Sequence, residues 1–296
     1  MQSIGLPILI TLLIWWFATG LVLLINGLPK ATFGSSMAVA SLMGLAGLVG
    51  LYVLRDDVST SGAYLGFLAA MAIWAWNEIG FLLGHITGPR RDPCPPEARG
   101  MRRFLLASQS IIYHELLILA SGVAIAIISW DAPNQIGLQT FLVLWLMRLS
   151  SKFNIFLGVP NVTVHFLPPH LMYLASFFAN KPMNLLFPFS ITLATIVTAW
   201  LGWNAGAAEA GSFAQISSVL LATLMALAVL EHWFLVVPLP FGNLWNWSLG
   251  SRASKHSVVS TPTDEGGGVA PLPVSIQNHF IESSTKPGQR AELVMK

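Results

Sequence analysis

Carboxylates stand beside imidazoles, or close to them, at three places in an otherwise apolar sequence. The three stretches are NEIGFLLGH (Asn77–His85), YHEL (Tyr113–Leu116) and EHWFL (Glu231–Leu235). A charged side chain at membrane depth costs about 2.5–3.5 kcal/mol on insertion scales, and such side chains usually face the interior of a helix bundle. Carboxylates and imidazoles are also common metal ligands. The three stretches therefore predict a polar site buried in a membrane protein.

Three interpretations of this site remain open. The side chains can bind a metal, with iron favoured, although the Glu-x-x-His spacing of di-iron bundles is absent. Histidines can instead ligate the metal of a tetrapyrrole, with carboxylates nearby. In the third interpretation the pairs only hold helices together by hydrogen bonds. The candidate metal ligands are Glu78, His114, Glu115, Glu231 and His232. The candidate tetrapyrrole ligands are His114, His232, His85, His165 and His170.

The composition of the chain places these residues in a membrane. Of 296 residues, 54% are hydrophobic and 9% are charged, whereas soluble domains carry about 25% charged residues. Apolar runs of about 20 residues can cross the hydrocarbon core as helices. The sequence therefore predicts an all-α polytopic helix bundle. Seven spans are predicted, at 4–26, 33–54, 62–87, 104–129, 136–157, 184–204 and 213–237.

One further apolar stretch, 162–179, is short and is broken by Pro168 and Pro169. A double proline removes helix donors and restricts the preceding residue. We therefore expect a half-helix or re-entrant segment here, so that the chain has seven spans and not eight.

The distribution of charge predicts the orientation of the bundle. The loop GPRRDPCPPEARGMRR (88–103) holds five arginines and two acidic residues. By the positive-inside rule this loop is cytoplasmic, which puts the N-terminus in the periplasm and the C-terminus in the cytoplasm. Arg148 and Lys152 lie near a predicted cytoplasmic helix end. We expect these two side chains to extend toward the lipid headgroups.

The predicted spans bring the candidate residues to similar depths. At about 1.5 Å per residue, Glu78 lies about 14 Å from the cytoplasmic loop, His114 about 15 Å and Glu231 about 10 Å. Glu78 and His85 are seven residues apart and would share one helix face. These depths predict one shared site in the cytoplasmic half of the membrane.

The chain divides into two parts by composition. Residues 1–247 are predicted to form the membrane domain. Residues 248–296 are rich in Ser, Thr, Gly and Pro and are predicted to be a disordered cytoplasmic tail.

The stretch WNEIGFLLGHITGPRRDPCP (Trp76–Pro95), followed by YHEL and EHWF, resembles a known family. It is similar to the PuhE-type photosynthetic complex assembly proteins of purple phototrophic bacteria, a domain of unknown function. The resemblance covers roughly Ile4 to Trp247. It provides no catalytic residues, so the site residues above rest on membrane burial and ligand chemistry alone.

The resemblance implies a multi-pass protein of the bacterial inner (intracytoplasmic) membrane. Its implied role is in assembly of the reaction centre and light-harvesting complex, or in bacteriochlorophyll supply. The expected partners are membrane lipids and photosynthetic complex subunits or bacteriochlorophyll biosynthesis proteins, and nucleic acid is not expected. The cofactor, if one is bound, would be iron or a tetrapyrrole. The alternative is a metal-dependent, di-iron-like membrane oxidoreductase acting on a pigment precursor or a lipid.

Overall fold

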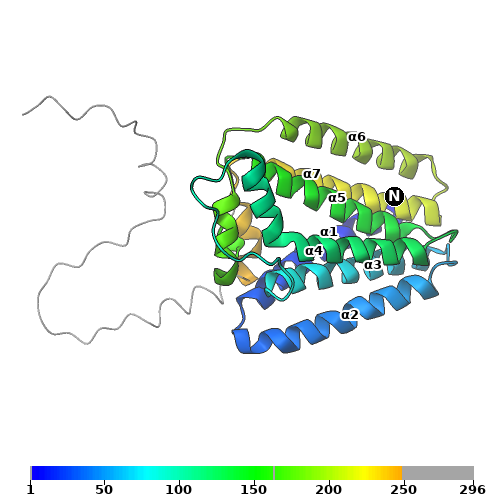
Figure 1. The fold of residues 1–296 in the computed structure, drawn as a ribbon. Helices are drawn as coiled ribbons and strands as arrows, with labels where there is room; N and C mark the ends of the chain where they lie inside the picture. Colours follow the sequence, from blue (N-terminus) through cyan, green and yellow to red (C-terminus); the bar gives the residue numbers. More distant parts are fainter. Residues whose placement is uncertain (1, 163, 249–296) are drawn as a thin grey trace, which may run out of the picture. The chain divides into compact units, whose positions relative to one another are not determined.

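Seven long α-helices make up the membrane domain in a computed structural model that describes residues 2–162 and 164–248. They are α1 (Gln2–Gly27), α2 (Phe33–Val53), α3 (Thr60–Leu82), α4 (Gly100–Ile128), α5 (Ile136–Leu157), α6 (Leu186–Ala207) and α7 (Phe213–Phe234). Each helix is long and apolar enough to cross a bilayer. The predicted all-α polytopic bundle is confirmed (Figure 1).

The helices α3 and α7 form the centre of the bundle. α3 contacts α1, α2, α4, α5 and α7, and α7 contacts α1, α3, α5 and α6. The α2 and α6 helices lie at opposite edges (Figure 1). Phe67 of α3 and Leu220 of α7 are both fully buried in the largest apolar cluster. Side chains carried by α3 and α7 are therefore the best placed to meet those of several other helices.

The end of α3 differs from the predicted span, which ran to residue 87. The helix ends at Leu82 because Gly84 has a φ of 78°, a left-handed conformation that favours glycine. The N–H of Gly84 donates to the Phe81 carbonyl, and the N–H of His85 donates to the Gly80 carbonyl. These two bonds make a Schellman motif, which satisfies carbonyls left free at a helix end. The prediction that residues 83–87 continue the helix is wrong.

The proline-broken segment 162–179 is not among the membrane-spanning helices of the described residues. It contains two 3₁₀ helices, η2 (Val164–Phe166) and η3 (Pro169–Phe177), which lie across one end of the bundle (Figure 1). The Arg103 guanidinium of α4 donates to the Phe177 carbonyl at 2.7 Å. The Nε2 atom of His170 donates to the Leu82 carbonyl at 2.9 Å. These bonds hold η3 at the end of the bundle where α3 ends and α4 begins. The segment therefore does not cross the bundle, which agrees with seven spans.

The chain after α7 folds back on α1. In the short helix η4 (Phe241–Trp245), the Trp245 indole N–H donates to the Trp16 carbonyl at 2.9 Å. The Trp16 indole N–H in turn donates to the Leu244 carbonyl at 2.9 Å. These two bonds join the chain around Leu244 and Trp245 to α1. The domain boundary at residue 247 stays a prediction. Apart from Ser248, the predicted disordered tail 248–296 lies outside the described residues.

Candidate functional site

Five ionisable side chains from three helices meet inside the bundle. Glu78 comes from α3, His114 and Glu115 from α4, and Arg148 and Lys152 from α5; we call these five residues the interhelical charge cluster. The Glu78 carboxylate is 3.9 Å from the His114 ring and 3.1 Å from the Arg148 guanidinium. The predicted convergence of the α3 and α4 groups is therefore present in the structure.

Both carboxylates on α3 and α4 have a cation from α5 as their partner. The Arg148 guanidinium donates to Glu78 Oε2 at 3.1 Å, and the Lys152 ammonium donates to Glu115 Oε1 at 2.5 Å. Arg148 and Lys152 are four residues apart and so lie on one face of α5. The expectation that these cations extend to the headgroups is wrong. A carboxylate buried in a membrane needs a counter-charge, and its attraction for the cation outweighs that of the headgroups.

The burial of the two partners in the Glu78–Arg148 pair is unequal. Glu78 is only 8% exposed, while the Arg148 side chain keeps 43% of its accessible surface. Arg148 also interacts electrostatically with Glu231 and Glu115. Arg148 is thus the cation hydrogen-bonded to Glu78, with Lys152 adding a weaker electrostatic contribution, and Arg148 has further acidic neighbours of its own.

His114 is the most enclosed residue of the cluster, with no exposed surface. Its ring stacks on Phe81 with centroids 4.4 Å apart. Neither ring nitrogen has a hydrogen-bond partner, and neither does Glu78 Oε1. The 3.9 Å from His114 Nε2 to Glu78 Oε1 is too long for a hydrogen bond. Buried polar groups are normally hydrogen-bonded, so these three atoms mark an unfilled interaction.

The loop after α3 holds His114 in place from the backbone side. The N–H of His114 donates to the carbonyl of Thr87 at 3.1 Å. One residue on, Gly88 lies so close to α4 that a Cβ atom there would overlap the Gln109 carbonyl oxygen. The hydrogen bond from Asn77 Nδ2 to Ser121 Oγ, 3.1 Å long, joins α3 to α4 on the other side. The ITGPRR part of the sequence therefore positions the cluster as well as carrying charge.

The pair on α7 lies beside the cluster and has its own partners. Glu231 is exposed and accepts a 2.6 Å hydrogen bond from the Trp15 indole of α1. His232 is buried; its Nδ1 donates to the Ala228 carbonyl at 2.9 Å and its Nε2 pairs with Ser150 Oγ at 2.9 Å. A ligand at His232 would therefore have to displace Ser150, whereas the ring nitrogens of His114 are buried without a hydrogen-bond partner.

The other candidate histidines do not lie in the cluster. His85 is exposed and lies beyond the Schellman motif, so the prediction that it shares a helix face with Glu78 is wrong. His170 is on η3, where it contacts Leu82 and Phe33. The backbone of His165 is in η2, but its side chain lies outside the described residues. Ligation of a tetrapyrrole by His85, His165 or His170 stays a prediction.

The metal interpretation also stays a prediction, and the geometry gives it little support. Within residues 2–162 and 164–248, no three His, Cys, Asp or Glu side chains converge in a way that could hold a metal ion. Glu78 and Glu115 face α5 cations, and Glu231 faces Trp15. A three-ligand set would have to form at the expense of these pairs.

Arg148 and Lys152 are the site residues that sequence reasoning missed. The signal was their spacing of four residues in an apolar helix, at a depth that matches Glu78 and Glu115. Intramembrane carboxylates usually pair with other groups inside the bundle, so Glu78 and Glu115 indicate two basic partners at the same depth.

Comparison with known proteins gives two matches. Residues 1–256 match the family model described as "Protein of unknown function (DUF3623)". The chain is also 40% identical over 267 residues to the "Uncharacterized 30.4 kDa protein in puhA 5'region" of Rhodobacter capsulatus. That alignment covers 88% of this chain and 97% of the relative. No solved structure matches significantly. The match runs through every helix and the charge cluster, so this chain belongs to the DUF3623 family.

Proposed function

We propose that this protein helps to assemble the photosynthetic reaction centre and light-harvesting complex, or supplies bacteriochlorophyll to it, in the bacterial inner membrane. The observation that carries the proposal is the Rhodobacter capsulatus relative, which is similar over 97% of its length and is named for its place in the puhA 5' region. The resemblance of Trp76–Pro95 to PuhE-type assembly proteins supports the same role. The arginine-rich loop supports an orientation with the N-terminus in the periplasm.

Within this role, we assign the working site to the pair of His114 and Glu78. The support is chemical: His114 has no exposed surface and two unpartnered ring nitrogens, and an acceptor oxygen of Glu78 is 3.9 Å away. Such buried, unsatisfied groups weaken a fold, so a native site that retains them has another use for them. A ligand atom or a small rotation would complete this hydrogen bond. Assembly subunits or pigment biosynthesis proteins would be the partners that exploit it.

The proposed role predicts a genetic result. Deletion of the relative's gene in Rhodobacter capsulatus should lower the membrane content of pigment–protein complexes several-fold, read from their near-infrared absorption. Expression of this chain should restore the content. The proposal fails if the deletion strain accumulates these complexes normally.

The same complementation assay tests the site. His114→Phe keeps an aromatic ring against Phe81 and removes both nitrogens, so the protein should accumulate normally and fail to restore the complexes. The matched control is His85→Phe, which makes the same change at an exposed histidine. Full restoration by His114→Phe at wild-type protein level would limit His114 to a packing role.

Metal content separates this proposal from the oxidoreductase alternative, which nothing in the described residues favours. Because Arg148 and Lys152 already neutralise Glu78 and Glu115, we expect no stoichiometric metal in protein purified in detergent without chelator. Elemental analysis and an absorption spectrum provide the measurement. Stoichiometric iron without a tetrapyrrole band would contradict the expectation and revive the enzyme hypothesis.

A further inference from the structure

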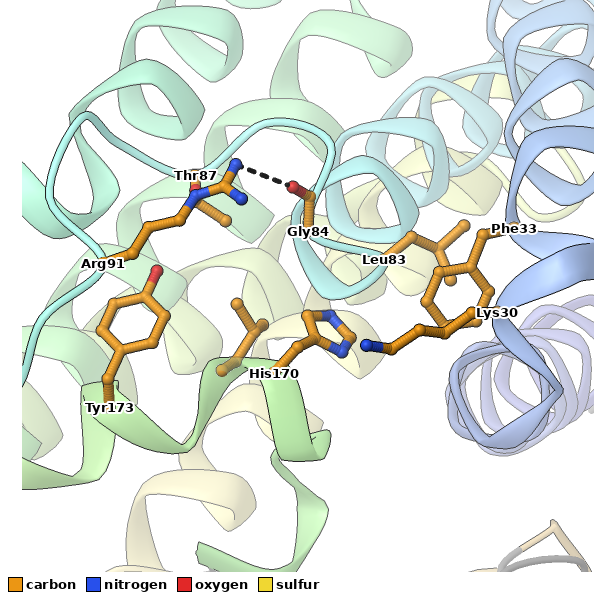
Figure 2. A pocket seen from close by; sticks show the side chains of 9 residues that line it. Lys30, Phe33, Leu83, Gly84, Thr87, Arg91, His170 and Tyr173 are labelled. Atoms are coloured by element: carbon orange, nitrogen blue, oxygen red, sulfur yellow. Dashed lines mark hydrogen bonds between the residues drawn. The ribbon is translucent and has the colours of Figure 1, made fainter.

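A cavity of about 200 Å³ lies at the end of the bundle where α3 stops, outside the interhelical charge cluster. It is formed where the short helix η1 (Lys30–Thr32), the start of α2, the turn and loop after α3, and η3 come together (Figure 2). Its lining residues are Lys30, Phe33, Leu83, Gly84, Thr87, Arg91, His170, Leu171 and Tyr173. None of these described residues is acidic, so the cavity combines basic and hydroxyl groups with an apolar wall.

Two cations at this cavity lack an acidic partner. Neither Lys30 nor Arg91 forms an ion pair with any residue in 2–162 or 164–248. Arg91 is held over the opening by a 3.4 Å hydrogen bond from its guanidinium to the Gly84 carbonyl, and the Lys30 ammonium points toward the ring of His170 (Figure 2). Two uncompensated cations that share one cavity attract an anion.

Two hydroxyl groups at the cavity are hydrogen-bond donors without a partner among the described residues. Thr87 is only 2% exposed, and its Oγ1 has no hydrogen-bond partner. The hydroxyl of Tyr173 is also buried without a partner, and it points toward Arg91 and Thr87 (Figure 2). A buried hydroxyl that lacks a partner is costly, so a bound acceptor would relieve two such groups.

His170 provides a further donor that depends on pH. Its Nε2 donates to the Leu82 carbonyl, so the neutral ring has no proton on Nδ1. Burial lowers the pKa of His170 below its usual value, and the nearby charges of Lys30 and Arg91 lower this pKa further. The hydrogen bond to the Leu82 carbonyl raises the pKa, but it does not cancel the lowering. The ring is therefore neutral at pH 7 while the cavity is empty.

We propose that this cavity binds a phosphate group, and we call it the phosphate pocket. A phosphate offers several oxygens in a tetrahedral arrangement, which suits two cations and two hydroxyls better than the two coplanar oxygens of a carboxylate do. Phe33, Leu83 and Leu171 supply an apolar wall for the group that carries the phosphate. The phosphate can come from an anionic phospholipid headgroup or from a soluble phosphate ester, and both present a tetrahedral phosphate with at least two terminal anionic oxygens.

The test uses the full-length protein in detergent, with native mass spectrometry to count bound phosphatidylglycerol and phosphatidylcholine. We expect phosphatidylglycerol to bind the wild type in preference to phosphatidylcholine, because phosphatidylcholine adds to the same phosphate a choline cation that Lys30 and Arg91 would repel. Lys30→Gln/Arg91→Gln should weaken that binding roughly tenfold or more, since a hydrogen bond to a charged group contributes about 1.5–3 kcal/mol. The matched control, Arg99→Gln/Arg102→Gln, removes the same charge from the adjacent loop end and should bind within about twofold of the wild type.

Competition separates the two sources of phosphate. If inorganic phosphate displaces phosphatidylglycerol but acetate does not, the headgroup phosphate is the recognised group. If inorganic phosphate binds and phosphatidylglycerol does not, the pocket serves a soluble phosphate ester. Binding of neither probe, or equal loss in both double variants, would overturn the proposal. Should Lys30→Gln/Arg91→Gln fail to fold, Tyr173→Phe decides: it removes one hydroxyl and should weaken binding several-fold.

The pH dependence gives an independent readout. His170 is the one histidine among the lining residues, and histidine is the side chain whose charge ordinarily changes between pH 5 and 8. A bound phosphodiester favours the protonated ring, and affinity for phosphatidylglycerol should therefore rise as the pH falls below the usual range of histidine. His170→Gln keeps a donor for Leu82 and should abolish this rise. A rise of equal size in His170→Gln would contradict the assignment of His170 to the pocket.

Discussion

Gly88→Ala should prevent the protein from accumulating in a folded state. The new Cβ atom would overlap the Gln109 carbonyl oxygen and would crowd the backbone of Ser110 and Ile111, none of which can rotate away. Overpacking against fixed backbone costs about 3 kcal/mol or more. The loop would have to leave α4, which would break the hydrogen bond from the His114 N–H to the Thr87 carbonyl. Reversible unfolding in mixed micelles, or membrane protein level where unfolding is complete, measures the effect.

Gly202→Ala provides the control for that experiment. Gly202 lies inside α6, five residues before its last residue, and a Cβ atom there would meet nothing within 4 Å. Alanine is favoured over glycine in a helix interior by up to about 1 kcal/mol, so this variant should be as stable as the wild type or slightly more stable. Equal stability of the two alanine variants would show that Gly88 does not pack against α4 as described.

Arg148→Gln should destabilise the bundle by about 2–3 kcal/mol. Removal of one partner from a buried ion pair costs about 3–5 kcal/mol. We expect a smaller loss of stability for Arg148→Gln because the Arg148 side chain is 43% accessible. Glu78→Gln should cost less than Arg148→Gln. Glu78 is enclosed and has no other hydrogen-bonded cation, whereas Arg148 also has Glu231 and Glu115 as acidic neighbours.

A double-mutant cycle isolates this interaction. Glu78→Gln/Arg148→Gln should recover most of the stability lost in Arg148→Gln, giving a coupling energy of about 1–3 kcal/mol. The exposed pair of Glu97 and Arg102, which are 3.8 Å apart, serves as the control cycle and should couple by less than about 1 kcal/mol. Additive effects of Glu78→Gln and Arg148→Gln would mean that this pair does not join α3 to α5.

The helices themselves followed from composition, because a bilayer leaves the backbone few alternatives to a helix. Two boundaries show where that reasoning stops. The prediction extended α3 to residue 87, close to the start of the arginine-rich loop, yet Gly84 adopts a left-handed conformation and closes a Schellman motif at Leu82. For 162–179, the prolines correctly indicated that no straight span forms. They could not indicate that η3 would bond to the ends of α3 and α4.

The candidate site was predictable only in part. Burial of Glu78 and His114 followed from the cost of isolated polar groups in a membrane, and matched depth placed them at one level of the membrane. Their separation of 3.9 Å comes from the tertiary structure. The partners of the carboxylates did not follow, because which faces of α3, α4 and α5 meet depends on packing between helices. Depth counting therefore grouped Glu231 with Glu78, whereas Glu231 is hydrogen-bonded to Trp15 of α1.

The sequence by itself determined that the chain is a seven-span helix bundle with ionisable groups inside the membrane, because both properties depend only on transfer free energies along the chain. The tertiary structure alone decided what those groups do. It pairs Glu78 with Arg148 and Glu115 with Lys152, and it leaves His114 enclosed without a partner. The physical reason is that an ion pair or a cavity depends on the distances between side chains of different helices. Those distances are set by how the helices pack, and the order of residues along the chain does not give them.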